Sequence, residues 1–204
     1  MRKRQNVHYD VVRRNSPMPI EATRKLFDVD AYYRMAEIGI IGPEERVELI
    51  DGEILQMSPI GVRHAGCVNI ANELFCAAFK GKAVVSVQNP LRLNNYNEPE
   101  PDLVLLKRRE DRYRGKRVEG GDALLVVEVA DTTLKFDRDV KLVRYARQGV
   151  PEVWIEDLNA EVLLVYRNPS GDQFLAQLVL RSGDSVSVEA FPETSFAVSE
   201  LLGV

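Results

Sequence analysis

The apolar residues of this chain recur with two periods, which predict helices and strands. Residues 27–38 show helical spacing, and so do residues 64–80, where the run ends in a glycine. Between them, residues 46–57 form two short apolar runs joined by Asp51-Gly52, a dipeptide typical of a tight β-hairpin turn. The first part of the chain is therefore predicted to be a helix, a hairpin and a second helix.

The middle of the chain contains short runs rich in Val, Leu and Ile, which predict strands. Their apolar character is continuous rather than alternating, and this is typical of strands covered on both faces. The predicted strands are residues 83–87, 102–106, 123–129 and 153–157. Between the last two, residues 136–149 predict a crossover helix that buries the face carrying Val140, Val143 and Ala146.

The last part of the chain predicts a β-meander over residues 162–167, 174–180 and 185–191. Together these elements predict an α/β fold, in which a mixed sheet is flanked by helices and carries hairpin additions at both ends. Residues 1–20 hold five basic residues and no periodicity, which predicts a mobile basic arm, either solvated or in contact with nucleic acid. Residues 21–204 are predicted to form one domain.

Composition fits one globular domain and adds a charge pattern to this picture. The 204 residues are 45% hydrophobic and 28% charged, which excludes disordered, collagen-like and wholly basic nucleic-acid coat proteins. The net charge of −4 is unevenly distributed, because residues 1–14 hold five basic and one acidic residue, and residues 107–119 hold seven and three. The remainder is acidic. We expect the 107–119 segment to be either a phosphate-contacting loop or a solvated connection.

Several common classes of site are excluded by the residues available. The only histidines are His8 and His64, so a structural zinc site is not expected, and no phosphate-binding glycine loop or GxSxG nucleophile motif occurs. Cys67 and Cys76 lie about 13.5 Å apart along one predicted helix, too far for a disulfide. Free thiols, with no export signal and no apolar segment long enough to span a membrane, predict a cytoplasmic protein.

Two carboxylates occur where burial of a charged group would cost free energy. Asp102 opens a predicted strand, and Glu128 lies inside the apolar run LLVVEVAD. A buried charge needs a compensating cation, a proton or a place at the rim of the sheet. Glu128 is therefore either a strand-end residue paired with an arginine or, with Asp102 and a backbone carbonyl, part of an oxygen site suited to Mg²⁺ or Mn²⁺.

Three further residues admit both a structural and a chemical interpretation. Lys141 lies one position from the apolar face of the crossover helix, where it either points toward the carboxylates or pairs with Asp137 at the surface. Glu48 is either a solvent-facing hairpin residue or a site residue. His64 either begins its helix or contributes to the site.

The ordered series of segments RVELIDGEILQMSPIGVRHA, EPEPDLVLL and LLVVEVADTTLKFDRDVKLVRYARQGVPEVWIEDL closely resembles the Uma-type restriction endonuclease family. That family belongs to the PD-(D/E)xK nuclease superfamily. The resemblance extends from about Phe27 to about Arg167 and implies a restriction-endonuclease-like fold. The sequence before and after this range carries no comparable signature.

The resemblance also assigns residues to the site. Pro101-Asp102 stands at the PD position and Glu128 at the (D/E) position, whereas the lysine position falls at Ala130. In this family the lysine is displaced to the following helix, where Lys141 matches. Glu48 and His64 match further positions of the family pattern. The implied metal ligands are Asp102, Glu128 and the carbonyl of Val129.

The resemblance implies a Mg²⁺- or Mn²⁺-dependent endonuclease that hydrolyses DNA phosphodiester bonds. Because nucleases of this kind often place two sites on two strands, we expect a homodimer. Two other functions remain open. One is a catalytically degenerate nuclease fold that binds DNA or a protein partner, and the other is a phosphodiesterase acting on RNA or a small nucleotide.

Overall fold

A computed structural model describes residues 23–204, so the predicted basic arm lies outside the described residues. The helices are α1 (Val29–Glu37), α2 (Val62–Ala78), α3 (Leu134–Phe136), α4 (Leu142–Arg147) and α5 (Val198–Leu202), with a 3₁₀ turn η1 (Gly120–Asp122) and a π-helical segment η2 (Asp137–Lys141). The strands are β1 (Val47–Ile50), β2 (Glu53–Gln56), β3 (Ala83–Val87), β4 (Leu103–Lys107), β5 (Ala123–Ala130), β6 (Glu152–Asp157), β7 (Val162–Ser170), β8 (Gln173–Arg181), β9 (Ser185–Ser187) and β10 (Ser195–Ala197).

A six-stranded sheet with the order β3-β4-β5-β6-β7-β8 forms the centre of the molecule. All neighbouring strands are antiparallel except β5 and β6, which are parallel and joined by the crossover formed by α3, η2 and α4. A parallel pair needs such a crossover because the chain must return to the same end of the sheet. The predicted mixed sheet flanked by helices is confirmed.

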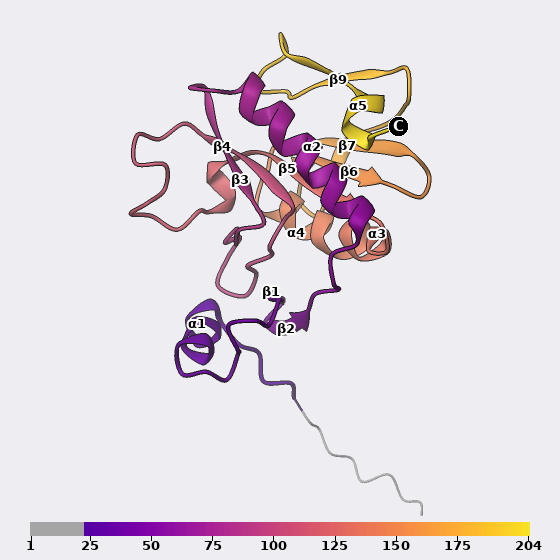
Figure 1. The fold of residues 1–204 in the computed structure, drawn as a ribbon. Helices are drawn as coiled ribbons and strands as arrows, with labels where there is room; N and C mark the ends of the chain where they lie inside the picture. Colours follow the sequence, from indigo (N-terminus) through magenta and orange to yellow (C-terminus); the bar gives the residue numbers. More distant parts are fainter. Residues whose placement is uncertain (1–22) are drawn as a thin grey trace, which may run out of the picture.

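Helices cover both faces of this sheet (Figure 1). On one face, α2 packs Phe75 against Trp154 of β6, with their ring centroids 5.9 Å apart. On the other face, Tyr145 of α4 packs among apolar residues of β4, β5 and β6. The continuous apolar runs of the central strands therefore reflect burial on both faces, as predicted.

The N-terminal elements also form where local signals predict them. Asp28 caps α1 by accepting a hydrogen bond from the backbone N–H of Ala31. Asp51 and Gly52 both have positive φ, as a tight turn between β1 and β2 requires. The hairpin stands apart from the central sheet as a separate two-stranded sheet.

Two of the predictions are wrong. Val140 and Val143 of the crossover are only partly buried, although Ala146 is buried as predicted, and the buried face also carries Asp137, Lys141 and Tyr145. The apolar spacing did not identify this face because Asp137 and Lys141 meet a polar site, while Tyr145 packs against the hydrophobic core.

The predicted meander is also interrupted. β7 and β8 join the central sheet, whereas β9 pairs with β10 in a separate sheet. Apolar spacing indicates that a segment is a strand but does not specify its partner, since pairing depends on contacts distant in sequence. Within residues 23–204, no helix has the length and apolar character needed to cross a membrane.

Candidate active site

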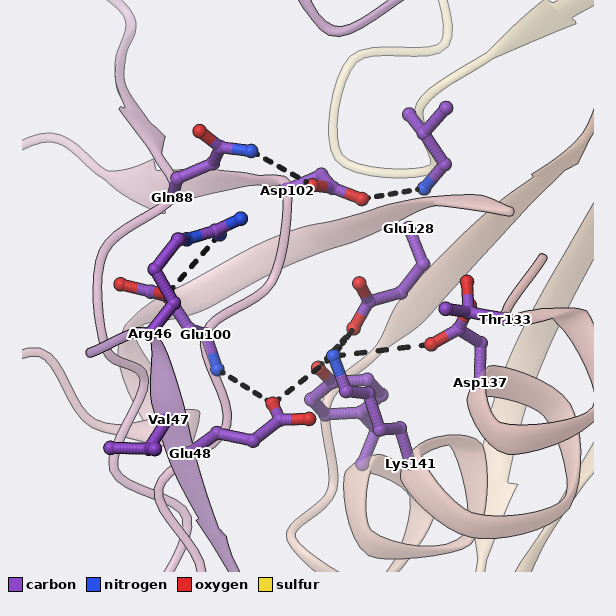
Figure 2. Close-up of polar contacts among 12 residues, drawn as sticks. Arg46, Val47, Glu48, Gln88, Glu100, Asp102, Glu128, Thr133, Asp137 and Lys141 are labelled. Carbon is purple, nitrogen blue, oxygen red and sulfur yellow. Dashed lines mark hydrogen bonds and ion pairs between the residues drawn. The ribbon is translucent and has the colours of Figure 1, made fainter. Parts of the chain in front are cut away.

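A buried lysine lies at the centre of a group of carboxylates beside the central sheet (Figure 2). The Nζ atom of Lys141 lies 3.2 Å from Glu48 Oε2, 3.4 Å from Glu128 Oε1 and 3.9 Å from Asp137 Oδ1. These four side chains are each at most about 5% exposed. The ion pairs are therefore shielded from bulk water, where Coulomb interactions are weaker.

Three separate elements bring these groups together. Glu48 comes from the hairpin strand β1 and Glu128 from the buried strand β5, while Asp137 and Lys141 come from η2. Asp137, Lys141 and Tyr145 follow one another at intervals of four, so they line the same side of the crossover. Tyr145 donates a hydrogen bond of 2.6 Å to Glu128 Oε1 and so fixes that carboxylate.

Asp102 lies directly before β4 and reaches the neighbouring strand β5. Its Oδ2 atom accepts a 2.8 Å hydrogen bond from the backbone N–H of Val129, and its Oδ1 atom lies 2.8 Å from His64 Nε2. Gln88 also donates to Oδ1, at 3.2 Å. Asp102, directly before β4, is thus linked to the neighbouring strand β5 through Val129, the residue that follows Glu128.

His64 enters the site from the first turn of α2. Its hydrogen bond to Asp102 raises the pKa of the imidazole, although partial burial acts in the opposite direction. A negative carboxylate stabilises the protonated ring, so His64 acts as a second cation beside the carboxylates when protonated. The interpretation of His64 as a simple helix start does not account for this contact.

The electrostatics of the site are dominated by burial of several negative groups. Desolvation raises the pKa of Glu128 well above its ordinary value, and nearby Asp137 and Asp102 add to this effect. Burial raises the pKa of Asp137 to about 6. Desolvation lowers the pKa of Lys141, but the carboxylates of Glu128 and Glu48 outweigh it and raise the pKa overall. Lys141 therefore stays charged at neutral pH.

These groups line a pocket of about 430 Å³ that opens to solvent. One wall is the segment that joins β2 to α2, residues 57–61, and the opposite wall is the start of the crossover helix. Glu100 also lines the pocket, and its backbone N–H donates a 3.2 Å hydrogen bond to Glu48 Oε2. The pocket gives a ligand access to the carboxylates and to Lys141.

Five of the six residues predicted from the sequence line this pocket: Glu48, His64, Asp102, Glu128 and Lys141. Val129, the sixth, is not among the lining residues, and its backbone N–H donates to Asp102. Sequence reasoning treated Asp137 only as a surface partner of Lys141 and did not identify Tyr145. The four-residue interval shared by Asp137, Lys141 and Tyr145 is the signal that would have identified this inner face. Gln88 carries no such signal, because its place depends on the turn after β3.

The basic segment after β4 lies away from this pocket. Asp102 precedes β4, whereas residues 108–119 follow its other end and fold toward the sheet edge formed by β3 (Figure 1). Several of its charges are already paired, since Lys116 contacts Asp122 at 2.8 Å and Arg109 contacts Asp111 at the same distance. Within residues 23–204, Arg112 and Arg114 form no ion pair.

Comparison with known proteins relates this chain to one protein family and to two solved structures. A family model described as "Putative restriction endonuclease", Uma2, matches residues 29–199. No curated protein matches the sequence. The fold is similar to the crystal structure of a protein described as a putative nuclease, from Anabaena variabilis ATCC 29413, with a TM-score of 0.67 and 15% identity over 87% of this chain and 98% of that one.

A second solved structure, the type IIG restriction endonuclease BpuSI, is matched with a TM-score of 0.41 and 14% identity over 72% of this chain and 16% of that one. The match to the family model covers most of the sequence, including every residue of the pocket described above. The chain belongs to the Uma2 family of putative restriction endonucleases, and its fold is that of a restriction-endonuclease-like nuclease.

Proposed function

We propose that this protein is a metal-dependent endonuclease that hydrolyses DNA phosphodiester bonds in the pocket around Lys141. The observation that carries the proposal is the contact between Lys141 Nζ and Glu128 Oε1 at 3.4 Å. Ala130 occupies the ordinary lysine position of the superfamily motif, yet the crossover delivers an amine to the carboxylate of the same motif. A displaced lysine therefore preserves the chemistry that Ala130 cannot provide.

The donor groups of the pocket fit a hard divalent cation. Three buried carboxylates, those of Glu48, Glu128 and Asp137, lie within 4 Å of Lys141, and Asp102 lines the same pocket. Burial, with a smaller effect of the neighbouring Asp137 and Asp102, raises the pKa of Glu128. Carboxylate and carbonyl oxygens are the ligands that Mg²⁺ and Mn²⁺ prefer. We propose that Asp102, Glu128 and the carbonyl of Val129 hold the ion.

No group of three His, Cys, Asp or Glu side chains between residues 23 and 204 is arranged as a metal-binding cluster. The proposed set has two carboxylates and a carbonyl, and water would complete the shell. Because Asp102 Oδ1 is shared by His64 and Gln88, a side-chain adjustment would accompany binding. Once bound, the ion would polarise the phosphate and lower the pKa of a coordinated water.

The protein groups then have distinct proposed roles. Lys141 is placed to orient the attacking water, and its charge offsets negative charge that develops on the phosphate. Glu48 pairs with the same amine at 3.2 Å and helps to hold it at the pocket. Tyr145 orients Glu128 through its hydrogen bond and does not itself reach the pocket.

The test is metal-dependent cleavage of plasmid DNA by wild type, Asp102→Asn and Glu128→Gln. We expect each substitution to lower the cleavage rate to background, since each removes a proposed ligand charge. Asp139→Asn is the matched control, because Asp139 is exposed on the crossover and pairs with Arg138 outside the pocket. Full activity in either site variant would exclude this assignment.

Calorimetric titration with Mn²⁺ separates the nuclease from a degenerate, DNA-binding relative. A working site binds Mn²⁺ in the wild type and loses that binding in Asp102→Asn and Glu128→Gln. Wild-type protein that binds DNA but neither binds the ion nor cleaves would support the degenerate alternative. Short RNA and mononucleotide diesters in the same assay address the phosphodiesterase alternative.

We also propose that two copies act together, since one pocket cuts one strand and symmetric dimers are the commonest oligomers. Light scattering of the purified protein tests this with and without duplex DNA. A monomer under both conditions, with cleavage intact, would overturn the dimer.

A further inference from the structure

A second pocket of about 530 Å³ lies along β3, the edge strand of the central sheet. Tyr33 of α1, residues 84–87 of β3, Glu98 and the basic segment after β4 line it. None of these residues lines the pocket around Lys141. The volume is in the range of sites that hold small organic ligands.

Glu98 gives this pocket an unsatisfied hydrogen-bond acceptor. The residue is only 4% exposed, and its Oε1 atom accepts a hydrogen bond from the hydroxyl of Tyr33. Its Oε2 atom is buried and has no hydrogen-bond partner among the described residues. A buried acceptor without a donor costs free energy, so a ligand that brings an N–H group to Glu98 would recover that cost.

The other walls favour a flat ligand with a negative group. The guanidinium of Arg117 lies over the ring of Tyr33, 4.1 Å from its centroid, and Tyr113 also lines the pocket. Arg112 is exposed at the same pocket and forms no ion pair within residues 23–204. Aromatic rings and guanidinium planes are the surfaces on which nucleobases stack, and a free arginine suits a phosphate.

The backbone beside the pocket is held in a conformation that is costly for ordinary residues. Arg112 and Tyr113 have φ values of +48° and +64°, both in the left-handed region. Side chains rarely adopt this region, and residues held in it are often found at ligand sites. Both side chains line the pocket, and Tyr113 also packs against the hydrophobic core at its edge.

The second pocket and the proposed active site lie on either side of one short segment. Glu98 lines the second pocket, whereas Glu100 and Asp102 line the first. Four residues of extended chain span at most about 14 Å. That distance corresponds to about four nucleotide steps along one strand of B-form DNA. One DNA strand could therefore reach both pockets.

We propose that the second pocket binds an unpaired nucleobase that carries an exocyclic amino group, with Glu98 as the acceptor. This inference rests on the proposed nuclease function, because it supplies base recognition a few nucleotides from the cleavage pocket. Arg112 contacts the adjoining phosphate, and Tyr33 and Arg117 form the stacking wall. The base is unpaired because Glu98 is buried and a paired base cannot enter the pocket.

The chemistry of the acceptor determines which base is favoured. A carboxylate accepts from the amino group of cytosine, whereas thymine presents a carbonyl oxygen at the equivalent position. Two oxygens that face each other repel, so thymine leaves Glu98 unsatisfied and adds an unfavourable contact. Cytosine is therefore expected to bind more tightly than thymine.

The experiment measures the binding of fluorescein-labelled dC and dT decamers by fluorescence anisotropy at pH 7.5, in EDTA to prevent cleavage. We expect wild-type protein to prefer the dC decamer by about tenfold, within the range of one good base contact. Glu98→Gln should reduce that preference to less than about threefold, because the amide no longer presents a charged acceptor. Arg112→Gln should weaken binding of both decamers equally and leave the preference unchanged.

Glu193→Gln is the matched control, since Glu193 is exposed, pairs with Lys82 and lies outside both pockets. It should retain the tenfold preference, and thermal melting should show that all variants fold. Equal binding of the two decamers by wild type would overturn the inference, and so would a full preference in Glu98→Gln.

The outcome is separable from that of the proposed function. If plasmid cleavage requires Asp102 but the preference for the dC decamer is the same in wild type and Glu98→Gln, only the inference of a base pocket fails. If base preference depends on Glu98 but no metal-dependent cleavage occurs, the nuclease proposal fails and the base pocket stands.

Discussion

Lys141 makes the arrangement of the pocket possible at the scale of single residues. Three carboxylates lie within 4 Å of its amine, and all are buried. A buried cation loses the free energy of its hydration. Attraction to a single carboxylate does not offset this loss, whereas attraction to several does. The same lysine therefore serves both the stability of the fold and the proposed chemistry, and the two roles can be separated by substitution.

Lys141→Met should destabilise the protein by about 3–5 kcal/mol at pH 7, because it leaves buried carboxylates without their cation. Adding Glu128→Gln removes one of those charges and should restore part of the stability, but not cleavage. Urea unfolding and plasmid cleavage, measured on the same preparations, test both parts. A double variant no more stable than Lys141→Met would contradict the role of Glu128 as a charge partner.

Asp137 predicts a pH dependence of stability. Burial raises its pKa from the ordinary 3.8 to about 6, so the folded state holds the proton more tightly than the unfolded state. Its contribution is then fully present below pH 3.8 and is lost as the pH rises through 6, by about 3 kcal/mol. Asp137→Asn does not titrate, so its free energy of unfolding should increase relative to wild type between pH 4 and pH 7.

Urea unfolding in EDTA at pH 4, 5, 6 and 7 measures this difference. Asp139→Asn, two residues along the same segment, is exposed and should show a constant difference from wild type. Parallel stability curves for wild type and Asp137→Asn would rule out a raised pKa at this position.

At the residue scale, the sequence alone predicts which groups are chemically unusual better than it predicts their contacts. Glu128 stands out because a charge interrupts an apolar run, and resemblance to a known family adds Glu48 and His64. Asp137 and Tyr145 were missed because a polar residue on a helix is usually solvated. Only the fold shows that the helix turns this face toward Glu128.

At the scale of elements, local sequence signals predicted the hairpin and the long helix. They failed where the structure of a segment depends on contacts with residues distant in sequence. The π-helical segment η2 contains both Asp137 and Lys141, and segments of this kind often occur at functional sites. The apolar pattern of residues 136–149 does not predict a π-helical segment. The strand β9 similarly pairs with β10 and not with β8, because pairing is decided by the packing of the whole C-terminal region.

The hairpin that carries Glu48 depends on the close packing of its turn. Gly52 has a φ of +76°, and an added Cβ would lie 2.7 Å from Leu26 Cβ. Gly39 has a φ of +78° with no atom within 4 Å of an added Cβ. The two glycines therefore share the same backbone strain on substitution, and only Gly52 adds a steric clash.

Gly39→Ala should cost about 1 kcal/mol through strain, and Gly52→Ala about 1–3 kcal/mol more through overpacking. Because Gly52 adjoins the strand of Glu48, its substitution should also slow DNA cleavage, while Gly39→Ala should leave cleavage unchanged. Chemical unfolding and cleavage assays measure the two effects. Equal costs for the two substitutions would show that the turn yields to the added methyl group.

At the scale of the whole molecule, the acidic pocket and the basic segment lie at opposite ends of the strand β4. Asp102 lies at one end of the strand and residues 108–119 follow the other. Composition predicted that the basic residues of this segment could contact DNA, but it could not show that Lys116 is already paired with Asp122. Within residues 23–204, Arg112 and Arg114 form neither an ion pair nor a side-chain hydrogen bond, so their side chains are available to phosphates, whereas Arg117 lies over the ring of Tyr33.

The double substitution Arg112→Gln and Arg114→Gln should reduce the salt dependence of duplex DNA binding. The affinity falls with salt, and each lost phosphate contact makes the slope of log affinity against log salt less steep by about 0.9. Losing two contacts therefore reduces the magnitude of the slope by about 2. Lys116→Gln is the control, because its amine lies 2.8 Å from Asp122 and should release no counterion on binding. Anisotropy titrations in EDTA, over about 50–200 mM salt, give the three slopes. Identical slopes for wild type and the double variant would show that the basic segment is a solvated connection and that DNA approaches the acidic pocket from another side.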